Sequence, residues 1–150
     1  MDNIAIELND ISFKLKSIGL LMSTLPTDLY KRDDLINFYR YFNQELKDKA
    51  KKLDKLLELL YKSSFPVSVI DVLENIALDL SNISILANNL SLDTCNTDDL
   101  SAGYCYIGQE VEKKADIIKR GVLKYGNYKK SIYNRQRDCR RLQYIYIQSL

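Results

Sequence analysis

The side chains best suited to chemistry in this 150-residue chain are two pairs of adjacent aspartates and a basic, tyrosine-rich segment near the C-terminus. Paired carboxylates such as Asp33-Asp34 and Asp98-Asp99 have the groups needed for acid–base catalysis. Each pair, however, falls where a helix is expected to begin, and acidic residues in the first turn of a helix stabilise its dipole. We therefore interpret both pairs as structural.

Other catalytic signatures are absent from the sequence. The chain has no histidine, which removes the side chain that most often serves as general base or metal ligand. It has no glycine-rich phosphate loop and no nucleophile elbow. Gln44-Glu45 and Gln109-Glu110 lack the nearby histidine that completes di-iron sites in helical bundles. Three cysteines without metal-ligand spacing suit a reducing compartment. The sequence therefore predicts a protein that is not an enzyme and needs no metal or other cofactor.

The strongest candidate for a binding site is the basic C-terminal segment. Residues 101–150 carry 11 basic and 4 acidic side chains, whereas residues 1–100 carry 11 basic and 16 acidic ones. Lysine and arginine neutralise phosphates, and tyrosines between them can stack on bases. The candidate residues of this segment are Lys129, Lys130, Tyr133, Arg135, Arg137, Arg140 and Arg141.

Three partners suit the basic segment on sequence grounds, and the chain's own acidic third helix suits it best. Nucleic acid is one, and the acidic surface of another protein is the second. The third is the chain's own third helix, because no basic residue lies between Lys62 and Lys113. An acidic middle and a basic end form an electrostatic dipole, which can steer a partner into contact.

The elements that position these residues are helices, because the chain contains one helical unit twice at an offset of 65 residues. Between residues 8–60 and 73–125, 16 of 53 positions are identical, where ordinary composition would give roughly three. The apolar residues recur in steps of three and four, which predicts helices that pack along one stripe. In the first helix of each unit the stripes are Leu8, Ile11, Leu15 and Ile18, and Leu73, Ile76, Leu80 and Ile83.

This pattern predicts an all-α fold. Each unit reads as a helix–loop–helix hairpin, and one hairpin cannot bury both of its apolar stripes alone. We expect two tandem-duplicated antiparallel hairpins to form an elongated four-helix bundle. A single domain, 1–150, then comprises repeat 1 (3–62), repeat 2 (68–125) and a basic C-terminal extension (127–150).

Local signals mark the ends of several helices. Pro26 should end the first helix, because it cannot donate a backbone hydrogen bond. Ser68 with Asp71 resembles a capping box at the start of the third helix. Gly126-Asn127 should stop the fourth helix, so that the C-terminal extension forms a separate basic helix. Its Tyr-Ile-Tyr-Ile end, 144–147, is alternatively an extended segment, since β-branched and aromatic residues favour strands.

Two pairs of repeated tyrosines differ in position. Tyr39 and Tyr104 fit the apolar stripes and are expected in the core. Tyr41 and Tyr106 lie two residues further on, away from the centre of the stripe. They either pack between hairpins or face a partner, so both are candidate binding residues.

The composition, rich in Asn, Lys, Ile, Tyr, Asp and Ser, resembles that of small proteins of bacteriophages and mobile elements. Among these, anti-CRISPR inhibitors have this size and lack catalytic motifs. The resemblance implies a stoichiometric inhibitor of a host defence system, working in the cytoplasm of a bacterial or other host cell. We expect a protein partner, alone or within a protein–nucleic-acid assembly. Direct nucleic-acid binding and a homo-oligomeric scaffold are the alternatives. No apolar run approaches the length of a membrane span, so no membrane partner is expected.

Overall fold

The computed structural model describes residues 3–63, 65–90 and 97–148, apart from the side chains of residues 27, 32, 128, 129, 132 and 138–148. In chain order the elements are α1 (Asn3–Thr24), the short 3-10 helix η1 (Thr27–Leu29), α2 (Arg32–Leu60), α3 (Val67–Asn89) and α4 (Thr97–Gln148). None of the residues in these ranges belongs to a β-strand. The all-α class predicted from the apolar spacing is confirmed.

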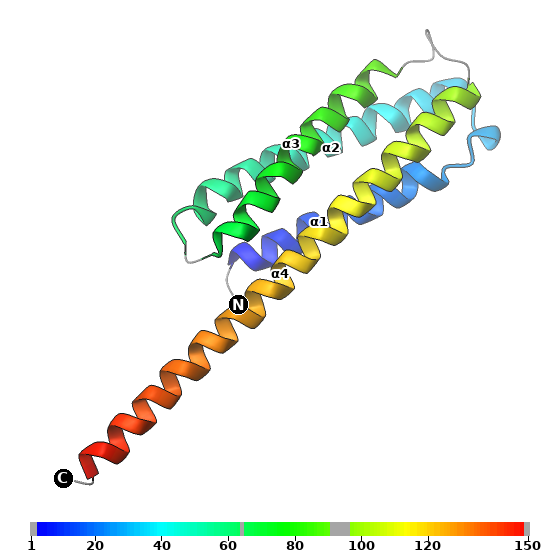
Figure 1. The fold of residues 1–150 in the computed structure, drawn as a ribbon. Helices are drawn as coiled ribbons and strands as arrows, with labels where there is room; N and C mark the ends of the chain where they lie inside the picture. The colour runs from blue at the N-terminus through cyan, green and yellow to red at the C-terminus, as the bar shows by residue number, and fades with distance from the viewer. Residues whose placement is uncertain (1–2, 64, 91–96, 149–150) are drawn as a thin grey trace.

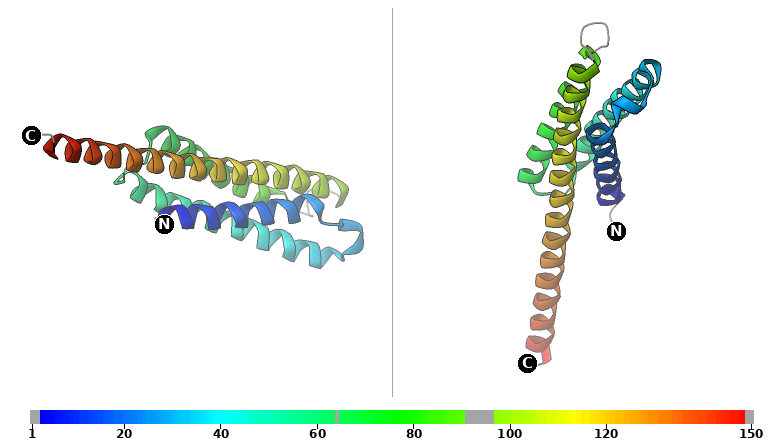
Figure 2. Two further views of the ribbon diagram at one scale, coloured as in Figure 1. Left: turned by 90° about the horizontal axis from the view of Figure 1, so that it is seen from below. Right: turned by 90° about the vertical axis from the view of Figure 1, so that its right-hand side faces the viewer.

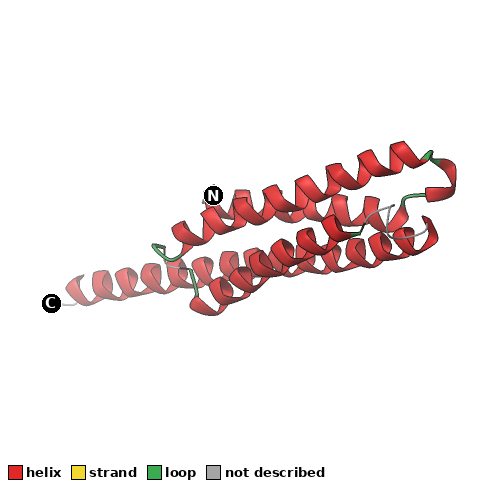
Figure 3. Cartoon of the chain, turned by 90° about the horizontal axis from the view of Figure 1, so that it is seen from above, coloured by secondary structure: helices red, strands yellow, loops and turns green. Residues whose placement is uncertain are grey.

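The four α-helices run alternately in opposite directions and pack side by side into an elongated body (Figures 1 and 3). α1 and α3 run in one direction, and α2 and α4 run in the other. The C-terminal part of α4 continues in a straight line beyond the ends of the other helices (Figure 2). Below, residues 3–125 are called the helical body and residues 126–148 the basic arm.

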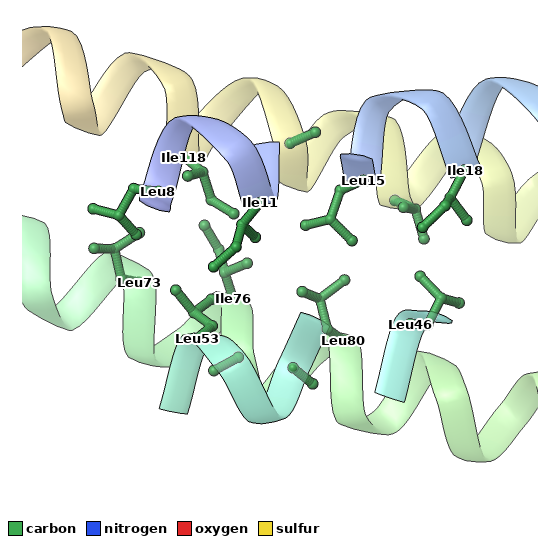
Figure 4. Close-up of a cluster of buried hydrophobic side chains, with 14 of the residues drawn as sticks. Leu8, Ile11, Leu15, Ile18, Leu46, Leu53, Leu73, Ile76, Leu80 and Ile118 are labelled. Atoms are coloured by element: carbon green, nitrogen blue, oxygen red, sulfur yellow. The ribbon is translucent and has the colours of Figure 1, made fainter. Parts of the chain in front are cut away.

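The core consists of the predicted apolar stripes. Leu8, Leu15, Leu73 and Leu80 expose at most 1% of their surface, and the side chains of α1 point toward those of α3 (Figure 4). The rings of Tyr39 and Tyr104 stack in the core near the first turns of α2 and α4, with centroids 3.7 Å apart and planes 8° from parallel. Tyr39 and Tyr104 are 65 residues apart, so equivalent positions of the repeat contact each other.

The closest-packed pair of helices is α1 with α4, followed by α2 with α3. Both pairs join one repeat to the other, whereas the two helices of a single repeat share fewer contacts. The predicted hairpins are therefore not the most tightly packed pairs of this body. In the 65-residue repeat, α1 is equivalent to α3, and the first part of α4 is equivalent to α2. The α1–α4 pair is therefore equivalent to the α3–α2 pair.

Backbone contact at two glycines explains why α1 and α4 pack most closely. A Cβ atom on Gly108 would lie 2.5 Å from the carbonyl oxygen of Gly19, and one on Gly19 would lie 2.6 Å from the carbonyl oxygen of Gly108. Both distances are shorter than any side chain tolerates, so only glycine fits. At the equivalent positions α3 and α2 carry Ser84 and Asn43, whose side chains are buried.

A buried hydrogen bond reinforces the contact between α1 and α4. The hydroxyl of Ser12 donates to the carbonyl oxygen of Ala115 at 2.7 Å. At the edge of the same seam, the Lys16 ammonium lies 2.9 Å from the Asp116 carboxylate and 3.5 Å from that of Glu112. The pKa of Lys16 is raised, chiefly because its ammonium donates to Asp116. Polar groups thus fix the register of two helices whose backbones touch.

Of the two helix ends considered first, one is as predicted and the other is not. α1 ends at Thr24, two residues before Pro26, as expected. The capping box at Ser68 is wrong, because α3 already begins at Val67 and Pro66 occupies the N-cap position without a side-chain hydrogen bond. Pro66 has no side-chain acceptor, and its carbonyl oxygen accepts hydrogen bonds from the backbone N–H groups of Val69 and Ile70.

The separate C-terminal helix is also wrong. α4 runs without a break from Thr97 to Gln148, through Gly126-Asn127 and through the Tyr-Ile-Tyr-Ile segment, which is helical and not extended. A glycine stops a helix when it adopts a positive φ, and no described glycine does so. Gly126 keeps helical geometry, so the predicted extension is the second part of α4.

Gly108→Ala should destabilise the protein. The added methyl group meets backbone atoms of Gly19 and Ser23 and the Cβ atom of Met22, none of which can swing aside, so the two helices must move apart. We expect a net loss of about 1–2 kcal/mol in denaturant unfolding, despite the better helix propensity of alanine. Gly126→Ala is the matched control, because nothing lies within 4 Å of its Cβ position. An equal effect of both substitutions would show that the backbone contact does not limit stability.

Leu15→Ala and Leu80→Ala should each lower the free energy of unfolding by about 2–5 kcal/mol, because both leucines are fully buried at mid-stripe. Leu20→Ala provides a control of the same residue type, since that leucine is 53% exposed. It should cost about 0.5 kcal/mol or less. Thermal or denaturant melts measure the difference, and similar values for all three would mean that the stripe is misplaced.

Candidate functional site

The basic arm begins where the helical body ends. The last core contact along α4 is the stack of Tyr125 on Phe65, with ring centroids 3.6 Å apart. Beyond it, every described side chain from 126 to 137 is exposed. Nothing surrounds the Cβ position of Gly126 within 4 Å. The arm therefore leaves the body as a single helix with solvent on all described sides.

Cationic residues dominate this arm. Its sequence contains Lys129, Lys130, Arg135, Arg137, Arg140 and Arg141 against the single acid Asp138, a formal side-chain charge of +5. Lys130, Arg135 and Arg137 are exposed, and none of them contacts an acidic side chain in the described part of the chain. The charges of these three described residues are not neutralised by the described part of the body.

Lys130, Tyr133 and Arg137 follow each other at spacings of three and four, which places them on one side of the helix. Tyr133 is 67% exposed, so its ring is presented to solvent between two cations. In the sequence, Arg140 and Arg141 continue this spacing. The structure places Lys129, Arg140 and Arg141 within α4, but their side chains lie outside the described part.

One of the three partners considered from sequence is incompatible with this geometry. Docking of the basic segment on the chain's own third helix requires the arm to fold back along the body. α4 instead continues straight, and the described arm residues have no contact with α3 (Figures 1 and 2). The arm cannot turn back without a break in α4.

Tyr41 and Tyr106 do not join the arm in one surface. Both are exposed, by 57% and 65% respectively, which fits the interpretation that they face a partner and not the one that they pack between hairpins. Tyr106 precedes Lys130 by 24 residues on the same helix, a separation of about 36 Å. The stack of Tyr39 on Tyr104 places Tyr41 at the same level of the body. The predicted binding residues thus form two regions at opposite ends.

The paired aspartates lie in the first turns of α2 and α4, where they interact favourably with the helix dipoles. The carboxylates of the two Gln-Glu pairs are bound to lysines of their own helices. Glu45 lies 2.8 Å from Lys49, and Glu110 lies 2.6 Å from Lys113. Within the described ranges, no group of three or more acidic or cysteine side chains could hold a metal ion.

A shallow hollow of about 300 Å³ lies between α1 and α4, lined by Asn9, Ser12, Phe13, Lys16, Asp116 and Lys119. Its most reactive groups, Lys16 and Asp116, are already joined in an ion pair. The hydroxyl of Ser12 is engaged with Ala115. We assign no chemistry to this hollow.

A buried polar network joins three helices near the start of α2 and α4 and the end of α3. The hydroxyl of Tyr104 donates to the carbonyl oxygen of Ala87 at 2.9 Å and accepts a hydrogen bond from Asn43 Nδ2 at 3.2 Å. Burial raises the pKa of Tyr104 to about 12. The network links α2, α3 and α4, and every donor in it is used for structure.

Comparison of the chain with protein-family models, curated proteins and solved structures gives no match. None of the helices in the described ranges has the length and apolar content that crossing a membrane would require. The candidate site therefore rests on the geometry of this chain alone.

Sequence reasoning missed two features. The Gly19–Gly108 contact had a signal, because glycine inside a helical pattern is unfavourable unless close packing requires it. The projection of the arm had a weaker one: the 65-residue repeat ends at residue 125, so the segment that follows has no counterpart in the first unit. Neither feature is visible in the stripe pattern alone.

Tyr104→Phe tests the buried polar network of Tyr104, Asn43 and Ala87. The variant removes the hydrogen bond to Ala87 and leaves Asn43 Nδ2 without its acceptor, so we expect a loss of about 1–3 kcal/mol at neutral pH. The raised pKa adds a pH dependence: folding holds the phenol proton more tightly, so this stability is present below about pH 10 and is lost as pH rises towards 12.

Unfolding measured at about pH 8 and about pH 11 should show a smaller alkaline loss for Tyr104→Phe than for the unmodified protein. Tyr106→Phe is the matched control, since that tyrosine is 65% exposed. Identical alkaline losses in all three proteins would remove Tyr104 from this account.

Proposed function

We propose that this protein is a non-catalytic binding protein whose basic arm binds the anionic surface of a protein or of a protein–nucleic-acid assembly. The observation that carries the proposal is the projection of an uncompensated cationic helix from a packed body. Lys130, Arg135 and Arg137 are exposed there without acidic neighbours among the described residues. A charged helix away from the body is accessible from all sides, which suits capture of a large partner.

The charge of the arm favours fast and specific association. Complementary potentials raise association rates and exclude partners of like charge. The acidic residues of 1–100 lie in the body, so the molecule presents a positive end to the partner. Acting by occupancy, one copy would block one site, which is the stoichiometric mode expected of an inhibitor.

The body itself is proposed to be a four-helix bundle of two tandem-duplicated hairpins. Two observations support this finer description. Residues 65 apart contact each other in the core, as Tyr39 and Tyr104 do. The two closest helix pairs, α1–α4 and α2–α3, are also exchanged by the same offset. In this proposal the body is a rigid support and the arm is the working part.

Direct binding of nucleic acid is the second candidate function. It is favoured by Tyr133, which is 67% exposed between Lys130 and Arg137 on one side of the helix. Cations on a helix can neutralise phosphates while an aromatic ring stacks on an unpaired base. The compositional resemblance to phage and mobile-element proteins makes a host defence complex, which often holds RNA or DNA, the first assembly to test.

The experiment reverses the charge of the described arm residues. Lys130→Glu, Arg135→Glu and Arg137→Glu together should abolish capture of the partner from a host lysate without lowering helicity of the body, because exposed side chains contribute little to stability. The matched control reverses three exposed lysines of the body, Lys31, Lys55 and Lys62. Capture that survives the arm reversal would refute the proposal.

Salt dependence separates the two candidate functions. For mixed-sequence RNA and DNA oligonucleotides, direct binding predicts a linear fall of the logarithm of affinity with the logarithm of salt concentration. For a protein surface, salt should mainly slow association, and the free oligonucleotides should not bind. Nuclease treatment of the captured assembly distinguishes a partner held through its nucleic acid.

A further inference from the structure

The described side chains of the basic arm lack the lateral contacts that stabilise helices in water. Isolated helices are marginal, and most helical stability comes from packing of one face against a neighbour. From Gly126 to Arg137 every described side chain is exposed. Ile132, Cys139, Leu142 and Tyr146 nevertheless recur in the sequence at spacings of seven, three and four, the rhythm of a helix that packs along one stripe. The arm is thus built as one half of a helix pair.

The outer face of α3 has the complementary features. Asp71, Glu74, Leu78 and Ile85 are all exposed and follow at spacings of three, four and seven, so they share one side of the helix. Leu78 and Ile85 are 61% and 59% exposed, which is unusual for aliphatic side chains at regular helical spacing. We call these four residues the α3 face.

The charge of α3 is opposite to that of the arm. α3 contains three acids and no base, and no lysine or arginine occurs anywhere between Lys62 and Lys113. Asp79 is already paired with Lys114 of α4. Asp71 and Glu74 have no cationic partner among the described residues, although the hydroxyl of Tyr61 lies 3.2 Å from the Glu74 carboxylate. The face therefore combines uncompensated acid with exposed apolar surface.

The two surfaces also agree in length. α3 has 23 residues, and residues 126–148 of α4 number the same, so each is about 35 Å long. The arm cannot reach the α3 face of its own chain, because α4 is unbroken and leads away from the body (Figures 1 and 2). An arm can reach this face only from another molecule.

We propose that the basic arm of one copy of this chain docks on the α3 face of a second copy. Lys130, Arg135 and Arg137 meet Asp71 and Glu74, and the apolar residues of the arm cover Leu78 and Ile85. Each copy offers one arm and one face, so two copies can exchange arms reciprocally and close a two-fold dimer with no free site.

This self-association does not depend on the proposed function, since it needs no other partner. It does use the same arm, so an external anionic partner and a second copy compete. Mass measurements on the pure protein test the dimer, whereas capture experiments with lysate or oligonucleotides test the proposed function. Either can fail while the other holds.

Two charge-reversed variants test the contact. Variant A carries Arg135→Glu and Arg137→Glu in the arm, and variant B carries Asp71→Lys and Glu74→Lys on the α3 face. Light scattering at low salt should give twice the chain mass for the unmodified protein and the chain mass for A and for B alone. An equimolar mixture of A and B should recover the dimer, because the acidic arm of A meets the basic face of B and the native arm of B meets the native face of A.

The control reverses Lys119 and Lys124, two exposed lysines of α4 within the helical body, and should remain dimeric. Circular dichroism confirms that each variant is folded. The proposal is overturned if the unmodified protein is a monomer at about 100 µM. It is also overturned if variant A or B dimerises alone, or if the mixture stays monomeric.

Discussion

The contact between the backbones of Gly19 and Gly108 is the constraint on which the rest of this structure depends. It brings α1 and α4 closer than any pair with side chains at those positions could come. The approach allows Ser12 to reach Ala115 and places Lys16 over the acids of α4. It fixes the direction of α4 at one end of the body, and thereby the direction in which the arm leaves the other end.

The sequence predicts the buried stripes well because buried apolar residues recur at the period of the helix. Leu15 and Leu80 could be assigned to the core from spacing alone, since a helix has only one side that faces its neighbours. Which helices pack most closely could not be derived in this way. That depends on the volume of a few residues at the crossing, and an apolar count does not distinguish Gly108 from Asn43.

The arm illustrates a different limit of sequence reasoning. Gly126-Asn127 has the composition of a helix end, but composition does not determine the φ angle that glycine adopts. The cationic residues can be identified as a candidate site from the sequence, because charge patterning is read directly from it. Their projection from the body cannot be identified in this way, because it depends on where the other three helices end. The sequence leaves the surroundings of Tyr41 and Tyr106 open, because their exposure is a result of three-dimensional packing.

The unbroken length of α4 has a mechanical consequence. Gly108, where the helix is clamped, precedes the end of the helix by 40 residues, or about 60 Å. A tilt of about 5° at this pivot would displace the far end by about 5 Å, roughly one turn of helix. A small change of direction at this crossing would thus be amplified into a displacement as large as a side chain. How precisely α1 holds the direction of α4 at this crossing therefore determines how precisely the arm is positioned.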